Sequence, residues 1–418
     1  MLTREENELL CRVGPGTPMG EFMREYWIPA LRAQAVTPDG APVRVRLLGE
    51  NFVAFRATDG RVGFFDEGCP HRCTSLALAR NEDNALTCIF HGWKIDVSGQ
   101  VVEVPSEPPE RRAEFAAKVR VRHYPVREAG DAIWVYLGRR AQPPAFLNFE
   151  LNVLPPSHRM AFRAILHSNW LQALETSIDS SHLGIMHSSW LNGRANSGSP
   201  LATVNTGPTF EIVPQPYGFR EAALRDLFDG TVYTRIREVA APFYSFIPMD
   251  SNMLHTMQCP VPIDDNWCVY WSFRYDPDKP VDPEQAVGMM RGTSGNRDNA
   301  HSDLGEFDQM WGQDRKKMKE GHFTGMRALQ HEDWAVAESV GAILDRTREY
   351  LGSSDSTLIR FRRMMLAAVR AHQQGAPALG LDREVDYSRI RAITLRNPKT
   401  LDWRQIDTLN PPPSLPLT

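Results

Sequence analysis

The sequence predicts an α+β fold in which a small all-β domain precedes a larger domain of mixed helices and strands. Apolar and polar residues alternate between about residues 40 and 140, and helical patterns join the strand patterns after residue 168. The chain has 418 residues, of which 42% are hydrophobic and 23% are charged. This length and composition are typical of a folded protein with two or three domains.

The first predicted element is a helical segment at residues 1–39 that packs on the larger domain. Thr3 and Glu6 have the spacing of a capping box, so a short helix opens the chain. The sequence Gly-Pro-Gly at 14–16 ends this helix, and a second helical stretch follows at 19–26.

The second predicted element is the small all-β domain, at residues 40–142. Valine and leucine alternate with arginine over 43–47, and Asp59-Gly60 marks a turn between two strands. A further strand is expected at 133–137. This pattern indicates an antiparallel sheet built from hairpins.

The third predicted element is the larger domain, at residues 143–418. Proline pairs at 143–144 and 155–156 bracket a linker at its start. The expected elements are, in order, a helix at 168–190, several strands within 202–275, and helices at 331–350 and 356–372.

Composition and charge exclude several classes of function. The formal net charge of −4 argues against a general nucleic-acid binder. No apolar run approaches the roughly 20 residues that a membrane span needs. The first residues lack the pattern of a secretory signal, so we expect a cytoplasmic protein. Six cysteines are too few for a disulfide scaffold, and close Cys/His spacing then points to metal binding or catalysis.

One such spacing is C-x-H-x16-C-x2-H, formed by Cys69, His71, Cys88 and His91. Two thiolates and two imidazoles can bind one tetrahedral zinc ion. The same set can hold a 2Fe-2S cluster with sulfur on one iron and nitrogen on the other. Each half of the motif supplies one Cys and one His. This order favours the cluster, because two parallel loops then place both Cys on one iron and both His on the other.

The residues beside this motif strengthen the cluster interpretation. Cys69-Pro70-His71-Arg72 and His91-Gly92-Trp93 resemble the Rieske domain, which implies a 2Fe-2S cofactor. Cys73 has no cysteine near Cys88 with which to form the disulfide of some high-potential Rieske proteins. We therefore expect Cys73 to be a small buried residue, and the missing disulfide fits the oxygenase-type branch.

A second motif, D-x2-H-x4-H, is formed by Asp179, His182 and His187. Two imidazoles and one carboxylate make the facial triad that holds Fe(II) and leaves positions open for O2. On an ideal helix, residues five apart point about 140° away from each other. The two histidines therefore converge only at a helix end or a π-bulge. The alternative is a pair of hydrogen-bonded histidines on a buried helix.

The two motifs together resemble the α subunits of Rieske ring-hydroxylating oxygenases, and 169–179 most resembles the phthalate dioxygenase branch. The resemblance implies an all-β Rieske domain followed by a helix-grip α+β catalytic domain. It also implies a third iron ligand in the pattern E-D-x-A-x-x-E-x-x-G-x-I, which residues 332–343 match. Asp333 is the expected ligand and Glu332 the second choice. The alternative is that both are carboxylates favoured at a helix N-terminus.

The resemblance further implies how electrons travel. Electrons from NAD(P)H reach the chain through a separate flavin and ferredoxin-type reductase, since the sequence has no nucleotide-binding motif. The cluster of one subunit lies beside the mononuclear Fe(II) of its neighbour in a homotrimer or a dimer of trimers. Asp179 bridges a Rieske histidine, His71 or His91, to His182 of the neighbour, so it is the expected catalytic residue. A purely structural helix cap is the alternative for Asp179.

The expected substrate is a carboxylated aromatic compound, phthalate- or benzoate-like, which the enzyme hydroxylates as a ring dioxygenase. A carboxylate is well bound by an arginine fork, and Arg220, Arg235 and Arg237 are the candidates. Surface salt bridges are the alternative role for each. Three other functions remain open: an O-demethylating monooxygenase for methoxylated aromatic acids, an electron-transfer Rieske protein, and a zinc-stabilised binding module.

Overall fold

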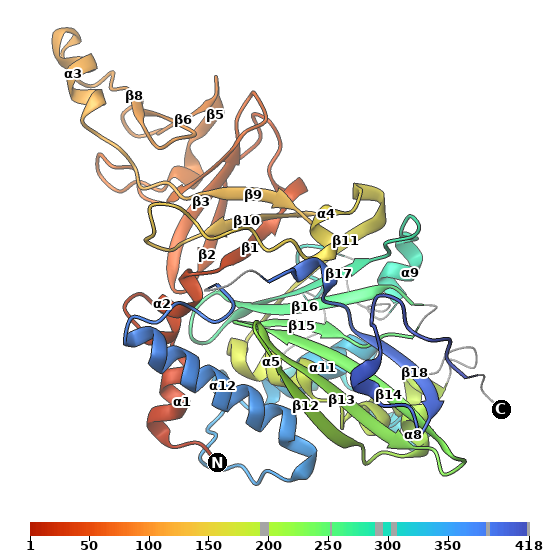
Figure 1. Cartoon of the computed structure of the whole chain (residues 1–418). Coiled ribbons are helices and arrows are strands. Elements are labelled where there is room, and N and C mark those ends of the chain that lie inside the picture. The colour runs from red at the N-terminus through yellow and green to blue at the C-terminus, as the bar shows by residue number, and fades with distance from the viewer. Residues whose placement is uncertain (193–199, 251–252, 289–295, 302–306, 382–384, 416–418) are drawn as a thin grey trace.

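The computed structural model describes the chain except for residues 193–199, 251–252, 289–295, 302–306, 382–384 and 416–418. Figure 1 shows a smaller β-rich part above a larger part that is organised around one long sheet. The two parts share a core, in which Trp134 of the smaller part stacks on Phe273 of the long sheet with ring centroids 6.0 Å apart. This packing fixes the smaller part on the larger one.

The smaller part contains three antiparallel sheets. Their strands are β2 (Val43–Leu47), β3 (Glu50–Arg56) and β4 (Val62–Asp66); β5 (Arg80–Glu82), β6 (Ala85–Thr87), β7 (Lys94–Asp96) and β8 (Val101–Glu103); and β1 (Trp27–Arg32), β10 (Ala132–Tyr136) and β9 (Val126–Ala129). The short helix α3 (Arg112–Ala117) contacts β8. Gly60 takes a φ of 89° in the turn between β3 and β4, as the Asp-Gly pair predicts.

The first two of these sheets enclose a separate core. It contains Phe55 of β3, Phe65 of β4 and Leu86 of β6, together with Cys69 and Cys88 from the loops between strands. Burying both cysteines in this core holds the two loops side by side.

The larger part is built on an eight-stranded antiparallel sheet. Its strand order is β11 (Arg159–Leu166), β17 (Cys268–Tyr275), β16 (His255–Pro262), β15 (Tyr244–Ile247), β14 (Thr231–Ala240), β13 (Gly218–Asp226) and β12 (Thr209–Gln215). The last strand, β18 (Ile393–Pro398), pairs with the first half of β14, whereas β15 pairs with its end. The sheet therefore gains its eighth strand without extending at either edge.

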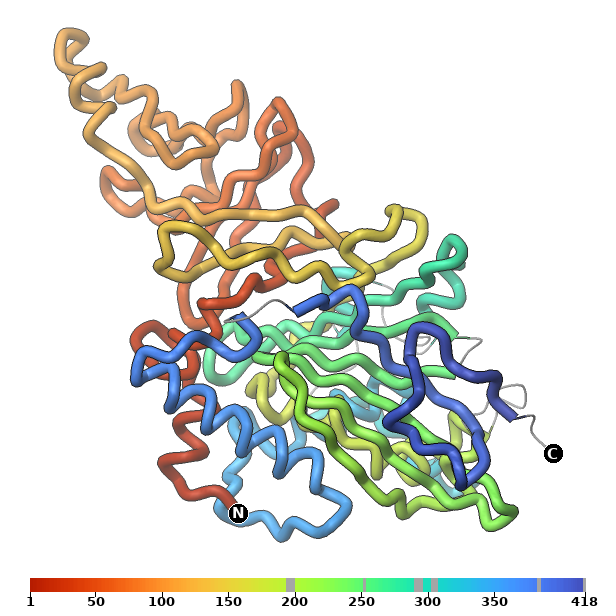
Figure 2. Tube along the Cα trace, viewed as in Figure 1, coloured from red at the N-terminus to blue at the C-terminus, as the bar shows by residue number. Residues whose placement is uncertain are grey.

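Helices α5 (Trp170–Ile178) and α11 (Leu329–Ser339) pack against each other, and α5 crosses β15, β16 and β17. Helix α12 (Ser356–Gln373) contacts α1 (Arg4–Cys11) and α2 (Pro18–Arg24), as Figure 2 shows at the N-terminal end of the trace. The shorter helices are α4 (Glu150–Val153), α6 (Leu183–Met186), α7 (Ser188–Asn192), α8 (Leu201–Val204), α9 (Pro283–Val287) and α10 (Arg315–Lys319). None of the helices in the described part of the chain combines the length and apolar character that crossing a membrane requires.

The N-terminal segment contacts both parts of the molecule. The capping box is confirmed, because Thr3 and Glu6 each accept the backbone N–H of the other at 3.2 Å. After α2 the segment becomes a strand, and β1 pairs with β10 of the smaller part. Residues 1–39 are thus helical where they meet α12 and extended where they meet the smaller part.

Two predicted helices are shorter than expected. The helix predicted at 168–190 ends at Ile178, because the Asp179 carboxylate accepts the N–H groups of Ser181 and His182 and competes with the helix. The helix predicted at 331–350 ends at Ser339, and Gly341 beyond it takes a left-handed φ of 87°. The first break lies within the second motif, at Asp179.

Candidate functional site

Two loops of similar form carry the residues of the first motif: Cys69 and His71 follow β4, and Cys88 and His91 lie between β6 and β7. In one loop the N–H of Cys73 donates to the carbonyl of Cys69 at 2.8 Å. In the other, the N–H of Gly92 donates to the carbonyl of Cys88 at 2.9 Å. Cys73 and Gly92 both take the left-handed conformation that closes such turns.

The four side chains meet between the loops. The rings of His71 and His91 are 4.5 Å apart, and Trp93 stacks on His71 at the same distance. Burial raises the pKa of the Cys69 thiol to about 11, and the adjacent Cys88 thiol adds to the rise. Within the described structure, Nδ1 of His71 is buried without a hydrogen-bond partner. Two buried thiols and an unpartnered imidazole nitrogen fit a cluster bound by two sulfurs and two nitrogens.

The expectation that Cys73 is buried was wrong. Cys73 is exposed and free, because it ends the turn that begins at Cys69 and takes a φ of 58° at the corner of the loop. Ile89 and Phe90 at the tip of the second loop are also exposed, with 57% and 53% of their surface accessible. The cluster site therefore lies at an exposed, partly apolar end of the smaller part.

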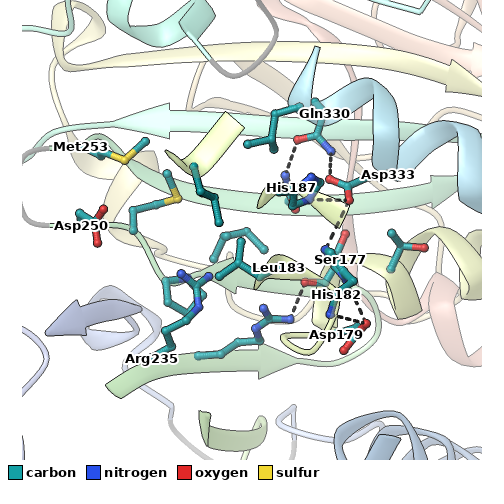
Figure 3. Close-up of a pocket in the computed structure, with 18 residues that line it drawn as sticks. Ser177, Asp179, His182, Leu183, His187, Arg235, Asp250, Met253, Gln330 and Asp333 are labelled. Carbon is teal, nitrogen blue, oxygen red and sulfur yellow. Dashed lines mark hydrogen bonds and ion pairs between the residues drawn. The ribbon is translucent and has the colours of Figure 1, made fainter. Parts of the chain in front are cut away.

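The second motif lies where α5 ends. Asp179 is the C-cap of α5, and the one-turn helix α6 separates His182 from His187. This helix end brings the two imidazole rings to 5.0 Å although the residues are five apart in sequence. Helix α11 supplies Asp333 from its first half, and Figure 3 shows it joined by dashed lines to both histidines.

The distances between these side chains suit one metal ion. Oδ1 of Asp333 lies 3.1 Å from Nε2 of His187 and 3.5 Å from Nε2 of His182. Neighbouring ligands of an octahedral ion with bonds near 2.1 Å are about 3 Å apart. Oδ1 of Asp333 is buried and accepts no hydrogen bond in the described structure. His182, His187 and Asp333 thus form a set of donors that fits the facial triad of a non-heme Fe(II) site.

Each of the three side chains is oriented by a second residue. His182 Nδ1 contacts the Asp179 carboxylate at 3.0 Å, and His187 Nδ1 contacts Glu332 at 2.5 Å. The Gln330 side chain donates to Oδ2 of Asp333 at 3.0 Å. Both imidazoles therefore turn Nε2 toward Oδ1 of Asp333.

The charges around the site favour a bound cation. Burial opposes protonation of His187, but Asp333 and Glu332 outweigh it and raise the pKa of His187 to about 9. Burial likewise opposes ionisation of Asp179, but its contact with His182 lowers the pKa of this carboxyl to about 2.

A pocket opens beside the triad. Its apolar wall consists of Leu183, Leu191, Ile247, Met249, Met253 and Leu329. Its polar lining includes Asp250, Gln258, Arg235 and Arg237, as the close-up in Figure 3 shows in part. A mostly apolar cavity with a few polar groups is typical of a site for a small organic substrate.

The three candidate arginines have different surroundings. Arg220 lies outside the pocket and forms an ion pair with the buried Glu238. Arg237 lines the pocket, but its guanidinium donates to the carbonyl of Ser177 and to Ser180 Oγ. Arg235 lines the pocket as well, makes one long contact of 3.5 Å to Tyr233, and has no partner at Nε within the described structure.

Apart from Asp179, the sequence did not reveal the residues that orient the triad. Gln258 of β16 donates to Gln330 of α11 at 2.9 Å, and Thr324 donates to Glu332. Glu332, the second choice as a ligand, contacts the far nitrogen of His187 rather than the metal position. In the sequence, the two adjacent acidic residues at 332–333 pointed to Glu332. No pattern in the sequence pointed to Gln258, Gln330 or Thr324.

Comparison with known proteins supports this architecture. Residues 26–125 match the Rieske 2Fe-2S domain family, and residues 135–412 match the family described as LigXa C-terminal domain like. The fold is similar to the terminal oxygenase of carbazole 1,9a-dioxygenase from Nocardioides aromaticivorans, with a TM-score of 0.59, 19% identity, and 87% of this chain and 97% of that chain covered. Dicamba monooxygenase gives a TM-score of 0.58 at 18% identity over 85% and 99%. The predicted fold class is confirmed.

Curated relatives match over nearly the whole chain. The phthalate 4,5-dioxygenase oxygenase subunit of Pseudomonas putida is 38% identical over 97% of this chain and 94% of its own. The 3-chlorobenzoate-3,4-dioxygenase oxygenase subunit of Comamonas testosteroni is 35% identical over 96% and 97%. The 5,5'-dehydrodivanillate O-demethylase oxygenase subunit of a Sphingobium species is 30% identical over 92% and 84%.

The fold, the two metal motifs and these matches define a Rieske-type aromatic ring-hydroxylating oxygenase. The chain belongs to this family as an oxygenase subunit, in the branch of the phthalate dioxygenase oxygenase subunit. Its cofactors are a Rieske 2Fe-2S cluster and a mononuclear iron, and NAD(P)H supplies electrons through a reductase.

Proposed function

We propose that this chain is the terminal oxygenase that hydroxylates a carboxylated aromatic compound, phthalate- or benzoate-like, as a ring dioxygenase. It uses O2 and electrons from NAD(P)H that a separate reductase delivers. The observation that carries the proposal is the convergence of His182, His187 and Asp333 beside a pocket that also contains Arg235. The names of the phthalate and chlorobenzoate relatives support the same substrate class.

In this proposal Cys69, His71, Cys88 and His91 hold the Rieske cluster, and His182, His187 and Asp333 hold the mononuclear iron. The cluster supplies electrons one at a time, and the iron supplies the activation of O2. The unpartnered Nδ1 of His71 and Oδ1 of Asp333 support the two assignments, because both atoms are buried. The protein's own contribution is to bind, orient and enclose the substrate beside the triad.

Arg235 is the proposed partner of the substrate carboxylate. The guanidinium of Arg237 is already occupied by Ser177 and Ser180, and that of Arg220 by Glu238. Arg235 is 6% exposed, so an anion that enters the pocket meets a cation with little competing water. The apolar wall of the pocket is then available to pack against the aromatic ring.

We further propose a homotrimer or a dimer of trimers in which Asp179 bridges neighbouring subunits. The side chains of Asp179 and His182 are 25% and 21% exposed, whereas that of His187 is 3% exposed. The exposed Ile89 and Phe90 beside the cluster site supply an apolar surface for the contact. The electron donor in this proposal is a flavin and ferredoxin-type reductase.

A single turnover of the chemically reduced protein under labelled O2 tests the proposed reaction. The substrates are a panel of carboxylated and methoxylated arenes, and mass spectrometry identifies the products. A cis-diol with two labelled oxygens is the expected result. Full iron with no product from any arene would overturn the substrate class.

An O-demethylating monooxygenase is the second candidate, because the dehydrodivanillate O-demethylase subunit is 30% identical over 92% of this chain. It uses the same metal sites, so the same experiment separates the two functions. One labelled oxygen with release of formaldehyde would identify the demethylase. The intact set His182, His187 and Asp333 counts against a protein that only transfers electrons.

A further inference from the structure

A fully buried carboxylate lies behind His187. Nδ1 of His187 donates to Oε2 of Glu332 at 2.5 Å, and the two side chains are 3% and 0% exposed. A carboxylate can only accept here, so Nδ1 carries a proton and Nε2 is the nitrogen that would bind a metal ion. Nε2 is the atom that faces Oδ1 of Asp333.

Glu332 is itself held in place on both of its oxygens. While Oε2 accepts from His187, Oε1 accepts from the hydroxyl of Thr324. That hydroxyl oxygen accepts the N–H of Met326 at 3.2 Å, which fixes its orientation. Glu332 also lies in the first turn of α11, where the helix dipole stabilises an ionised carboxylate.

The other histidine has a looser partner. Asp179 and His182 are 25% and 21% exposed, and Asp179 divides its carboxylate between the imidazole of His182 and two backbone N–H groups. Asp179 is the C-cap of α5, whereas Glu332 lies in the first turn of α11. The two histidines are therefore oriented by carboxylates that differ in freedom to move.

We propose that Glu332 is a positioning residue that makes His187 the rigid ligand of the mononuclear metal and leaves His182 the adjustable one. By accepting the Nδ1 proton it fixes the tautomer and ring orientation of His187 and strengthens Nε2 as a donor. Thr324 keeps Glu332 in that orientation. The inference rests on the proposed function, since it concerns the same metal site.

The test compares Glu332→Gln with the matched control Glu338→Gln in the full-length protein. Glu338 is also on α11, its side chain is 7% exposed, and it also contacts a histidine, His301, at 3.1 Å. Its partners lie outside the triad. The readouts are the rate at which a chelator removes mononuclear Fe(II) and the electron paramagnetic resonance spectrum of the Fe(II)–nitric oxide adduct. The visible spectrum of the cluster reports that each variant is folded.

Glu332→Gln is expected to release Fe(II) about 10–100 times faster than the wild type and to change the shape of the nitric oxide spectrum. Glu338→Gln is expected to change neither. If Glu332→Gln does not fold, Thr324→Val tests the same chain of hydrogen bonds from Thr324 through Glu332 to His187. It is expected to accelerate the release of Fe(II) by a smaller factor. Wild-type release rates and spectra in the foldable variant would overturn the inference while the proposed function stands. A wild-type protein that binds no mononuclear Fe(II) would overturn both.

Discussion

Gln330 donates a hydrogen bond from Nε2 to Oδ2 of Asp333 at 3.0 Å, which leaves Oδ1 as the oxygen that faces the two histidines. The amide of Gln330 cannot turn over freely, because its oxygen accepts from Gln258 at 2.9 Å. A carboxylate held in this way presents one oxygen to a metal ion. A metal ion held by Asp333, His182 and His187 would keep other coordination positions open for O2.

We expect Gln330→Leu to weaken binding of the mononuclear iron by about 10–100-fold, because Asp333 loses the partner that orients it. Iron analysis after dialysis against a weak chelator measures the loss, and the visible spectrum measures the cluster separately. Asp333→Ala removes the ligand itself and is expected to lose the mononuclear iron completely, which is one of about three irons per chain. Full retention of iron by Gln330→Leu would show that Asp333 does not depend on this contact. Substitution of the exposed Gln373 by Leu is the control.

The local part of the site could be predicted from the sequence. The pitch of an α-helix requires a helix end for His182 and His187 to converge, and the structure places that end at Ile178. The predicted helix at 168–190 was too long because the hydrogen bonds of the Asp179 carboxylate depend on side-chain geometry that periodicity does not report.

The long-range part of the site could not be predicted in the same way. Gln258 and Gln330 come from a strand and a helix that meet only in the folded protein. Arg220 lies outside the pocket because the register of β13 against β14 places it opposite Glu238, with which it forms an ion pair. These contacts follow from strand order and register, which a single sequence leaves open.

Arg235→Met is expected to raise the KM for an aromatic acid by about 10–100-fold, because a charge-assisted hydrogen bond to a carboxylate contributes about 1.5–3 kcal/mol. Arg220→Met is the matched control, since Arg220 lies on the neighbouring strand outside the pocket. Steady-state kinetics with the natural reductase, or direct binding by calorimetry, gives the comparison. Equal effects of the two substitutions would exclude Arg235 as the specific partner.

Glu238 gives a prediction for the dependence of stability on pH. Burial raises the pKa of Glu238 from 4.5 to about 7, although Arg220 and Tyr217 oppose the rise. Because the folded state then binds the proton more tightly than the unfolded state, the contribution of Glu238 to stability falls as pH rises from 4.5 to about 7. The total fall is up to about 3 kcal/mol.

Glu238→Gln has no such titration. The wild type is therefore expected to lose stability relative to Glu238→Gln between pH 5 and pH 8, and the difference should change little above pH 8. Thermal unfolding of both proteins across this range, followed by circular dichroism, measures the difference. A difference that stays constant with pH, or grows in favour of the wild type, would show that Glu238 is ionised throughout.

Asp179→Asn is expected to retain both metals and to slow electron transfer between them. The amide keeps the size of the side chain but loses the charge that holds the proton on Nδ1 of His182, which Asp179 contacts at 3.0 Å. The measurement is the rate at which a reduced cluster is reoxidised in a single turnover with substrate and O2, alongside iron content and the cluster spectrum. Asp226→Asn, at an exposed carboxylate paired with Lys399, is the control. A wild-type reoxidation rate in Asp179→Asn would show that Asp179 acts only as a helix cap. A slow rate with full iron would place Asp179 on the path of electrons between the two metal sites.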